Sequence, residues 1–562
     1  MKSKKFLATM LSITMISTLS LIGCGDKKED GKKAESKVDA QVLKGVAGEP
    51  NTLDPAKADS DTALKPTGLL YEGLMRLEPQ ADGTGKIVNG MAESYKISDN
   101  QLKYTFTIRK DAKWSDGQPL TAKDFEYSIK RIVDPATASK VSFMINGVIK
   151  NASDILDKKK KPEELGVKAI DEQTLEIELE KPCGYFLDLT YLGPFKPVRK
   201  DKVEEFGNAY GTEASKMIGN GTFTLKEWTH KNKLVFEKNK NYWDVENVKL
   251  DTVDWSIMKD NNAKMQSFDN NEIDSVFVTE PDWIAKFKED PTNEFKNSRG
   301  NNIDYMLINI KNNKYLKNEK IRKALAISFD RENFVKMIWN DQAVPMYGYV
   351  TDGFSMGGKA YTDYVKNDFI KQIQTENPDA KKLLLEWLKE INEPEDPSKV
   401  SFRLFSRGTS ESEKQEAEFF QHAWKESLGV DVKIEQMDYS VMYDRVEKGD
   451  FDLAFNGWFA DYNDPSSFLD ALHSQYGVYK SAGWANKNYD ANLDKGKATL
   501  DPKERAALYL EAEKELVYKD TIIIPVMSTK NPRFVKNYVK NNFSTEFGVP
   551  DYKGVYIEGK NK

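Results

Sequence analysis

The chain has few cysteines and few histidines. Its 562 residues include two cysteines, Cys24 and Cys183, and three histidines, His230, His422 and His473. Two cysteines exclude a disulfide framework as the source of stability. No histidine is spaced with another histidine or a cysteine as metal ligands usually are, so the sequence predicts no metal site and no bound cofactor.

Nucleotide-binding motifs and surplus positive charge are also missing. The chain has no phosphate-binding glycine loop and no dinucleotide-binding fingerprint. Its formal net charge is −6, and it becomes −9 without the first 23 residues, which hold three lysines and no acid. From this balance we expect no basic surface for nucleic acid.

A long uncharged apolar run occurs at the N-terminus, from Phe6 to Ile22, directly after the three lysines. This pattern predicts a secretory signal peptide over residues 1–23. The run ends in Leu21-Ile22-Gly23-Cys24, which resembles the lipobox of bacterial lipoproteins and implies a lipid on Cys24. The alternative is a transmembrane anchor, although the run is short for a span of about 20 residues. Either reading places the body of the protein outside the cytoplasm.

The next residues have almost nothing to bury, so we predict a lipidated, disordered tether over residues 24–40. More than 500 residues follow, which exceeds what one hydrophobic core usually organises, and two or three domains are expected. The first half is rich in predicted strands, at Gln41–Ala47, Thr174–Glu180, Phe223–Trp228, Lys233–Lys238 and Val253–Met258.

The second half alternates helices with short apolar strands, which is typical of an α/β domain. The predicted helices are Asp379–Ile391, Ser412–Leu428 and Pro502–Lys519. The predicted strands are Ser401–Phe405, Val430–Ile434, Phe451–Asn456 and Thr521–Val526.

The stretch Asp99–Pro135 is the most informative part of the chain. Residues 102–109 alternate apolar and polar side chains, as a half-buried strand does. Ser115-Asp116-Gly117 supplies turn residues, and Thr121 with Asp124 forms a variant of the helix capping box. A strand, a turn and an amphipathic helix are therefore expected.

The residues of this stretch resemble the signature TFxLRxxxKWSDGxPxTAxDFxYS of the large substrate-binding proteins of peptide importers. Further similar blocks occur at Leu165–Pro182, Asn220–Trp228, Glu272–Val276, Lys320–Val335 and Gly457–Leu469. Their order and spacing identify the chain as similar to oligopeptide-binding lipoproteins of the OppA and AppA type, which are family 5 extracellular solute-binding proteins of ABC importers.

The resemblance implies an α/β, three-domain, two-lobed fold of the periplasmic-binding-protein type (type II), in which a hinge closes the lobes over a large ligand cleft. The implied boundaries are residues 41–78 with 212–308 and 530–562 for a discontinuous domain I, 79–211 for an inserted domain II, and 309–529 for an α/β domain III.

Two aspartates follow the predicted strand Leu453–Phe459, at the strand end where α/β sheets place their ligands. Asp464 precedes Pro465 and is explained as a helix N-cap. Asp461 has no such explanation, and it matches the family's aspartate that pairs with the α-ammonium of a bound peptide. The alternative is an aspartate in a surface loop.

The resemblance also implies how the rest of a peptide is held. The ligand would lie as an extra strand along edges near Ala58–Thr62, including Ser60, and near Gly457–Phe459. Side-chain pockets would be walled by aromatic residues, although an aromatic at a strand end is more often part of the core. The candidates are Tyr305, Tyr439, Trp458 and Tyr462.

One departure concerns the C-terminus of the ligand. Some family members have an arginine for this carboxylate just before the matching Gly-Trp, where this chain has Phe455-Asn456. Arg407 or Arg445 could take that role, since a buried carboxylate favours a bidentate guanidinium. The alternatives are that both are surface arginines, and that a longer cavity holds the ligand carboxylate through water.

The resulting hypothesis is a non-enzymatic receptor, lipid-anchored on the extracellular face of the cytoplasmic membrane as in Gram-positive bacteria, that captures oligopeptides and delivers them to an ABC permease. The same scaffold could instead bind nickel, haem, a sugar or a signalling peptide. Gly353–Gly357 also fits the G-x-S-x-G pattern of a hydrolase with Ser355 as nucleophile, but its loop-like surroundings argue against that reading. An adhesin or a chaperone-like surface protein is a third alternative.

Overall fold

The computed structural model describes residues 40–81, 83–544, 547 and 550–560. Cys24, the predicted signal peptide and nearly all of the predicted tether lie outside these residues. Among the helices that are described, none combines the length and the apolar composition needed to cross a bilayer.

The first sheet brings the N-terminal strand next to a segment two hundred residues away. Its order is β1-β10-β9-β8, in which β1 is parallel to β10 and the other pairs are antiparallel. Alternate side chains such as Leu234 and Phe236 are buried, as the period of two predicts. The strands are β1 (Val42–Ala47), β8 (Phe223–Thr229), β9 (Lys233–Lys238) and β10 (Thr252–Ile257), which confirms four of the expected strands.

A second, antiparallel sheet has the order β4-β5-β7-β6 and carries the stretch that was most informative in the sequence. Helix α2 (Ala122–Val133) packs its Phe125 and Ile129 into the same core as this sheet. The amide of Thr121 donates to Asp124 Oδ2 at 2.7 Å, so the capping box is formed. The strands are β4 (Ala92–Ile97), β5 (Lys103–Ile108), β6 (Val167–Ala169) and β7 (Thr174–Glu178).

The largest sheet has eight strands in the order β11-β20-β13-β19-β17-β18, with β12 and β14 also paired to β20. Strands β17, β18 and β19 are parallel, as in an α/β sheet, and the remaining pairs are antiparallel. The strands are β11 (Ser275–Phe277), β12 (Asn293–Arg299), β13 (Asn302–Ile308), β14 (Ala343–Pro345), β17 (Ser401–Ser406), β18 (Asp431–Gln436), β19 (Leu453–Phe459) and β20 (Ile523–Lys536).

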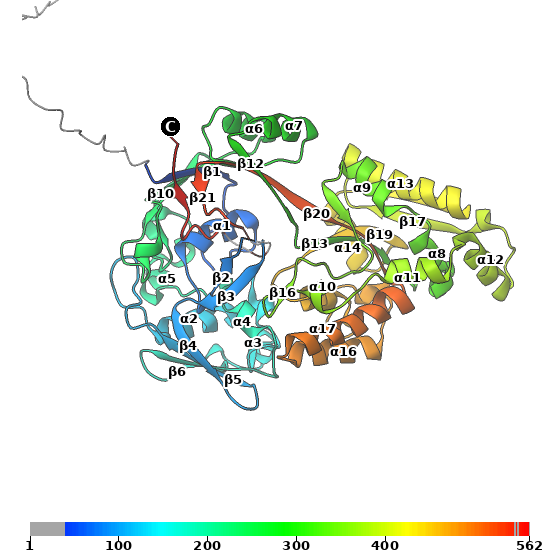
Figure 1. The fold of residues 1–562 in the computed structure, drawn as a ribbon. Coiled ribbons are helices and arrows are strands. Elements are labelled where there is room, and N and C mark those ends of the chain that lie inside the picture. Colours follow the sequence, from blue (N-terminus) through cyan, green and yellow to red (C-terminus); the bar gives the residue numbers. More distant parts are fainter. Residues whose placement is uncertain (1–39, 82, 545–546, 548–549, 561–562) are drawn as a thin grey trace, which may run out of the picture. The chain divides into compact units, whose positions relative to one another are not determined.

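Strand β20 is 14 residues long and belongs to two sets of partners. Its first half pairs with β13 and β14, and its second half pairs with β11 and β12. Figure 1 shows it in orange and red, running from β12 towards β13 and β19. It therefore connects the strand-rich part of the chain with the α/β part.

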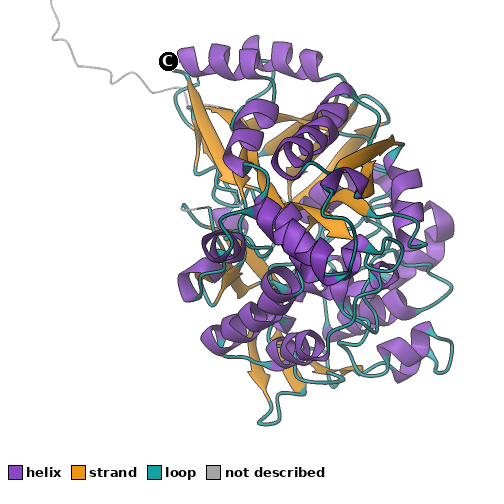
Figure 2. Cartoon of the chain, turned by 90° about the vertical axis from the view of Figure 1, so that its right-hand side faces the viewer, coloured by secondary structure: helices purple, strands orange, loops and turns teal. Residues whose placement is uncertain are grey.

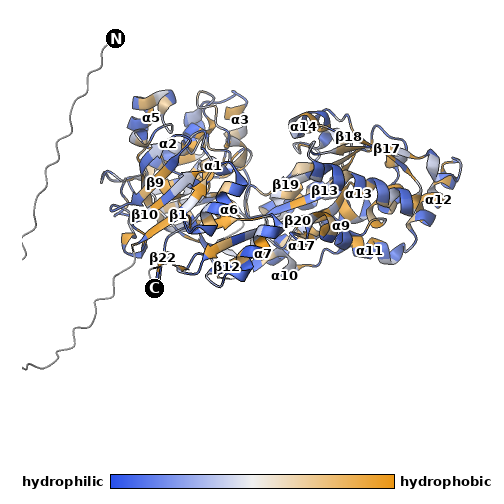
Figure 3. Cartoon of the chain, turned by 90° about the horizontal axis from the view of Figure 1, so that it is seen from above, coloured by the Kyte–Doolittle hydropathy of each residue, from blue (hydrophilic) through white to orange (hydrophobic). Residues whose placement is uncertain are grey.

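Helices flank the strands (Figure 2). Helices α12 and α13 carry both hydrophilic and hydrophobic residues (Figure 3), as expected for helices with one buried face. The expected helix Pro502–Lys519 is α-helical only to Glu513 and continues as a π-helical turn, Lys514–Lys519. The helices of this part are α8 (Glu319–Ile327), α9 (Arg331–Trp339), α10 (Tyr361–Tyr364), α11 (Phe369–Glu376), α12 (Ala380–Glu390), α13 (Glu411–Leu428), α14 (Tyr439–Glu447), α15 (Ser466–Leu469), α16 (Lys487–Ala498) and α17 (Pro502–Glu513).

The remaining α-helices and strands have at most 10 residues. They are α1 (Asp61–Leu70), α3 (Ala152–Leu156), α4 (Phe186–Leu189), α5 (Lys200–Phe206), α6 (Asn261–Asp269), α7 (Pro281–Glu289), β2 (Met75–Pro79), β3 (Gly85–Asn89), β15 (Ser355–Met356), β16 (Lys359–Ala360), β21 (Val539–Lys540) and β22 (Tyr556–Ile557).

The buried apolar side chains form two large clusters and a small one. The α/β part, from Ile303 to Met527, has its own core. The segments predicted as domains I and II share a second core, and Met265–Phe287 with Phe534 makes a third. The three domain boundaries stay a prediction, because one core crosses the expected border between domains I and II.

Candidate ligand-binding site

Strand β19 has one edge that is only partly covered. It pairs with β13 along its whole length, from Leu453 to Phe459. On the other edge β17 pairs only at Leu453 and Ala454. Within the part of the chain that the structure describes, no strand covers that edge from Phe455 onward. The end of β19 can therefore accept another extended chain.

The direction of the hydrogen bonds shows which residues present their backbone to this edge. The Ala460 amide donates to the Asn301 carbonyl at 2.8 Å, so Ala460 faces β13. Backbone direction alternates along an antiparallel strand, which turns Gly457 and Phe459 towards the open edge. The Gly457 amide has a local partner at 2.9 Å, Oδ1 of Asn456. Both residues lie in the range Gly457–Phe459 that the sequence analysis predicts as a strand-pairing edge.

Asp461 lies just beyond this edge with its carboxylate unpartnered. Its amide donates to Ser467 Oγ at 2.8 Å, which fixes the backbone. The side chain is exposed, and among the described residues it has no ion pair and no hydrogen bond to its carboxylate. Desolvation by the surrounding protein nevertheless raises the pKa of this carboxyl from 3.8 to about 6. Water reaches the carboxylate, while surrounding protein displaces much of the bulk solvent, so an ammonium partner would be favoured there.

Asp464 is in the opposite situation. It is fully buried, and its Oδ1 accepts hydrogen bonds from the Ser466 amide at 3.0 Å and from the Tyr509 hydroxyl at 2.7 Å. Arg505 Nε lies 3.4 Å from Oδ2, an ion pair without hydrogen-bond geometry. Asp464 therefore fixes the turn before α15, but the helix begins at Ser466 with Pro465 at the N-cap position, so the prediction of Asp464 as the N-cap was wrong by one residue.

Two of the expected aromatic walls are close to Asp461 in the sequence. Trp458 is half-buried, its indole N–H has no hydrogen-bond partner, and its ring meets Tyr479 edge-on at 6.1 Å. Tyr462 is nearly buried and stacks on Tyr185, with ring centroids 5.0 Å apart. One face of Tyr462 is therefore already used within the protein. Phe459 is 69 % exposed, so it offers the larger apolar surface at this edge.

Tyr305 and Tyr439 differ in exposure. Tyr305 is completely buried and donates its hydroxyl hydrogen bond to Tyr479 at 2.8 Å. Contrary to the prediction, it is a core residue, because it lies on the face of β13 that packs inside the α/β domain. Tyr439 begins α14 and is about half exposed, so it has surface to offer a ligand.

The segment Ala58–Thr62 belongs to no strand, contrary to the prediction of a strand-pairing edge there. Ser60 is instead the N-cap residue of α1, and its carbonyl accepts from the amides of Ala63 and Leu64. The Ser60 hydroxyl lies 3.0 Å from the Thr62 hydroxyl. Within this segment the Ala58 amide also donates to the Asp54 carbonyl at 2.9 Å.

Arg407 is held between two acids. Its Nη1 lies 2.8 Å from Asp304 and its Nη2 lies 2.9 Å from Glu416, both of which are buried. Burial raises the pKa of both carboxyls, and Arg407 opposes that rise. A Cβ at position 457 would lie 2.3 Å from Asp304 Oδ1, so Gly457 leaves the space that this triad needs.

Arg445 is also paired, with Glu435 and Asp450, each at 2.8 Å, and its side chain is about 30 % exposed. Neither arginine considered for the ligand carboxylate is free of acidic partners in the protein.

Sequence reasoning missed Asp304 and Glu416 as partners of Arg407. The signal for Asp304 was an acid inside the apolar run Ile303–Ile308, which is unusual for a charged residue unless it is paired. Nothing local pointed to Glu416, since it lies on α13 among other acids.

Ser355 does not lie in the surroundings that a nucleophile elbow requires. It belongs to the two-residue hairpin strand β15, and no helix follows it directly. Its hydroxyl accepts from Asn463 Nδ2 at 2.9 Å and lies 3.4 Å from the Gly85 carbonyl. Over the described residues, no group of three or more His, Cys, Asp or Glu side chains is arranged to hold a metal ion. Cys183 is buried and unpaired.

Solved structures similar to this chain define its class. MppA, a periplasmic murein tripeptide-binding protein in an unliganded open form, aligns with a TM-score of 0.78 and 30 % identity, covering 92 % of this chain and 98 % of that one. OppA of Listeria monocytogenes, bound to peptide, aligns with a TM-score of 0.69 and 30 % identity over 93 % and 100 % of the two chains. The expected two-lobed α/β fold of a solute-binding protein is therefore confirmed.

Sequence comparisons narrow the class to a family. The model for bacterial extracellular solute-binding proteins, family 5, matches residues 86–480. The dipeptide-binding protein DppE of Bacillus subtilis is 32 % identical over 546 residues, 95 % of this chain and 96 % of that protein. The periplasmic oligopeptide-binding protein OppA of Salmonella typhimurium is 33 % identical over 502 residues, 89 % of each chain. The chain belongs to the family 5 extracellular solute-binding proteins.

Proposed function

We propose that this protein is the substrate-binding component of an ABC peptide importer, which encloses extracellular oligopeptides and delivers them to a permease. Membership of family 5 supports an extracellular binding role. The names of the similar relatives, a dipeptide-binding and an oligopeptide-binding protein, favour peptides over other solutes.

The binding mode rests mainly on the unpartnered carboxylate of Asp461. A free peptide would add as a strand at Gly457 and Phe459, and its α-ammonium would meet Asp461 just beyond the strand end. Main-chain hydrogen bonds do not depend on the side chains of the ligand, and the ion pair with Asp461 requires only a free N-terminus. The site would thus accept many sequences. Trp458, Phe459 and Tyr439 would contact ligand side chains, because each offers exposed surface.

The acidic partners of Arg407 and Arg445 bear on the ligand's C-terminus. A guanidinium that already binds two carboxylates gains little from a third. We therefore favour a cavity in which water holds the ligand carboxylate, so that peptides of several lengths fit. Fixed-length recognition by a protein charge is the weaker alternative.

The proposed cellular setting follows from the N-terminal sequence. A lipid on Cys24 would anchor the protein to the extracellular face of the cytoplasmic membrane, and residues up to 40 would act as the tether. The three domains predicted from the sequence are the units that we expect to move when the lobes close over the ligand. We propose no catalytic role, and Ser355 is used in the contact with Asn463.

Two measurements test the proposal. Mass spectrometry of molecules released from the purified, denatured protein should show intact peptides with free N-termini. Binding of trialanine and of N-acetyl-trialanine should differ by roughly 10- to 150-fold, because a charged hydrogen bond contributes about 1.5–3 kcal/mol. Asp461→Asn should remove that difference.

Asp282→Asn serves as the matched control, because Asp282 is an exposed aspartate in the first turn of α7, away from β19. It should leave the preference for a free N-terminus unchanged. An Asp461→Asn variant that keeps the full preference would overturn the binding mode, and a non-peptide mass would overturn the ligand class.

A further inference from the structure

A segment of the strand-rich part docks on the α/β part beside the proposed ammonium site. This docking segment consists of residues 181–188, which include most of α4, and Figure 1 shows α4, in cyan, close to α17, in orange. The Gly184 amide donates to the Lys497 carbonyl of α16 at 2.6 Å. Tyr185 stacks on Tyr462. The two parts are therefore joined at this contact as well as through β20.

Gly184 makes the close approach possible. A Cβ at this position would lie 2.1 Å from the Thr499 carbonyl oxygen and 2.5 Å from Arg505 Nη1. The Thr499 oxygen belongs to the backbone, so it cannot move aside as the end of a flexible side chain can. A side chain at position 184 would therefore hold the docking segment away from α16 and α17.

The contact buries polar atoms that lack hydrogen bonds. Among the described residues they are Asp464 Oδ2, Arg505 Nε and Nη1, and Asp494 Oδ1. Lys181 of the docking segment lies 3.6 Å from Asp494, too far for a hydrogen bond. A buried polar atom without a partner costs free energy, which contact with water would restore. Docking is therefore less favourable than its buried apolar area suggests.

Asp188 is the acid of the docking segment that faces this cluster of charges. Desolvation by the surrounding protein raises the pKa of its carboxyl from 3.8 to about 7, although the residue keeps some exposed area. The positive charge of Arg505 and a hydrogen bond from the Asn463 side chain oppose the rise, and the charge of Asp464 adds to it. The contact therefore favours the protonated acid.

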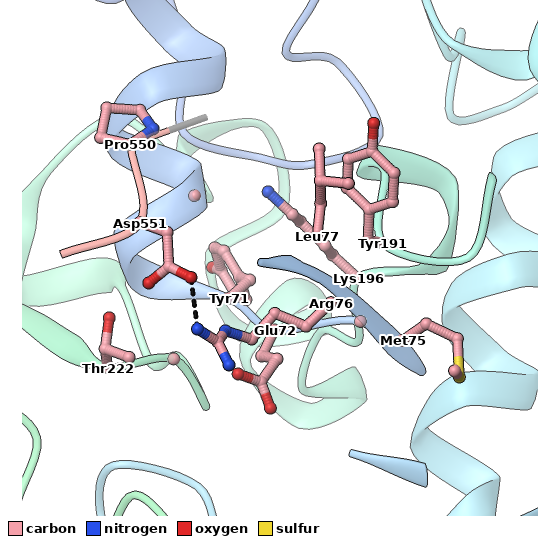
Figure 4. Close-up of a pocket in the computed structure, with 13 residues that line it drawn as sticks. Tyr71, Glu72, Met75, Arg76, Leu77, Tyr191, Lys196, Thr222, Pro550 and Asp551 are labelled. Carbon is pink, nitrogen blue, oxygen red and sulfur yellow. Dashed lines mark hydrogen bonds and ion pairs between the residues drawn. The ribbon is translucent and has the colours of Figure 1, made fainter. Parts of the chain in front are cut away.

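The neighbours of Asp188 within the strand-rich part are paired or neutral. Strand β2 packs against α4, and its Arg76 lies 2.5 Å from Asp551, a pair that Figure 4 shows beside a small cavity. Glu78 of the same strand lies 3.8 Å from Arg76. Burial raises the pKa of the Tyr191 phenol, so this group stays neutral. We therefore expect the contact to respond to pH through Asp188.

We propose that residues 181–188 form a latch, which separates from α16 and α17 without unfolding of either part, and that protonation of Asp188 favours the docked state. Tyr462 and Asp464 belong both to this contact and to the loop of Asp461. Release of the latch frees that loop from the strand-rich part. The latch thereby regulates the ammonium site, an effect that rests on the proposed function, whereas docking itself does not.

The direction of the pH effect follows from the two states of Asp188. After release, water solvates the carboxyl and its pKa returns towards 3.8. The docked state binds the proton more tightly, so this stabilisation is fully present below pH 3.8 and is lost as the pH rises through about 7. Release should increase by up to tenfold per pH unit until about pH 7 and stay constant above it.

Cys183 lies in the docking segment and can report its release. Its thiol is buried and unpaired, and the charges of Lys497 and Arg505 act on it, which indicates that it faces the contact. In the Cys24→Ser protein it is the only thiol. The test is its rate of labelling by 4,4′-dithiodipyridine between pH 5 and 8.5, without ligand. Dividing each rate by that of the urea-unfolded protein at the same pH removes the intrinsic pH dependence of the reagent.

The latch should open more often than the whole protein unfolds, so labelling should exceed the rate that urea denaturation predicts for global unfolding. Gly184→Ala should label faster at every pH, because its Cβ prevents docking. Asp188→Asn, which resembles the protonated acid, should label slowly and without pH dependence. The matched control is Lys181→Met, which removes only an exposed ion pair of the same segment and should behave as the unsubstituted latch.

Labelling no faster than global unfolding at every pH would overturn the latch, and so would equal labelling of Gly184→Ala and Lys181→Met. A pH dependence that persists in Asp188→Asn would overturn the role of Asp188. These outcomes are separate from those for peptide binding, because no ligand is present and Asp461 is unchanged.

Discussion

Asp461 and Asp464 belong to one short loop, yet the protein treats their charges in opposite ways. Asp464 is fully buried and receives hydrogen bonds from Ser466 and Tyr509. Asp461 is exposed and unpaired, although its raised pKa shows that the surrounding protein disfavours its charge. The Asp464 carboxylate has its partners within the protein, whereas the Asp461 carboxylate is available to a ligand.

The difference shows why sequence neighbours can have unrelated roles. A buried charge that is completed by the protein stabilises the fold only as long as its partner remains. A charge left incomplete does not stabilise the fold, because desolvation disfavours it, and it is available for binding. Substitution should therefore separate the two kinds of charge by what is lost, stability or ligand.

The largest effect on stability should come from Arg407. Like Asp464, it is a charged residue whose partners lie within the protein. Arg407→Met leaves Asp304 and Glu416 buried without their shared cation, and we expect a loss of about 3–5 kcal/mol in the free energy of unfolding. Urea denaturation measures it. Arg445→Met, whose ion pairs are partly exposed to solvent, should cost about 0–1 kcal/mol. Equal losses would show that burial does not distinguish the two arginines.

Asp464→Asn should have the next largest effect. The amide keeps an acceptor for Ser466 but leaves Arg505 without its acidic partner, so about 1–3 kcal/mol should be lost. Asp461→Asn should lose no stability, since its carboxylate has no partner to lose. If Asp461→Asn destabilised the protein as much as Asp464→Asn, the contrast between the two residues would disappear.

The pH dependence of peptide binding should sharpen the contrast. Asp461 must be ionised to meet an α-ammonium, and its pKa in the free protein is about 6. Affinity should therefore be constant above about pH 7 and fall as the pH drops through 6, by up to tenfold per unit. Titration calorimetry between pH 4.5 and 7.5 measures this change, and Asp461→Asn should lack it.

The stability of the ligand-free protein should change with pH in the opposite direction. The folded pKa of Asp461 lies above its usual value of 3.8, so the folded state binds this proton more tightly. The resulting stability is fully present below pH 3.8 and is lost as the pH rises through about 6. The difference in denaturation midpoint between wild type and Asp461→Asn should follow this course.

The smallest effect concerns Tyr462, which lies between the two aspartates. Its ring stacks on Tyr185 with an angle of 8° between the planes. Tyr185→Leu should cost about 0.5–1.5 kcal/mol beyond the change in buried area. A weaker peptide affinity at unchanged stability would instead show that the stack positions the loop for the ligand.

Much of the fold could be predicted because its signals are local. The alternation in β5 and the pairing of Thr121 with Asp124 are written within a few residues, and both were confirmed. The change from α- to π-helix after Glu513 could not be predicted. Glu513 binds the amides of Tyr349 and Val350 from a distant loop, and no periodicity records such contacts.

The candidate site likewise has features that local sequence predicts and features that it does not. The position of Asp461 after a strand could be predicted from order along the chain. The burial of Tyr305 and the triad around Arg407 depend on which segments meet in space. Single-sequence patterns carry that information only weakly, for example as an acid inside an apolar strand.

Strands β13 and β20 have a consequence for how this chain could be rearranged. They pair so that Leu307 is opposite Ile523, and the Ile308 amide donates to the Ile522 carbonyl. The two hundred residues between them leave and return at a single point. Residues 309–522 can therefore be regarded as an insertion. If they were removed, a short linker could join residue 308 to residue 523. We expect new termini within that insertion to be tolerated better than a break in β20, which both sets of strands share.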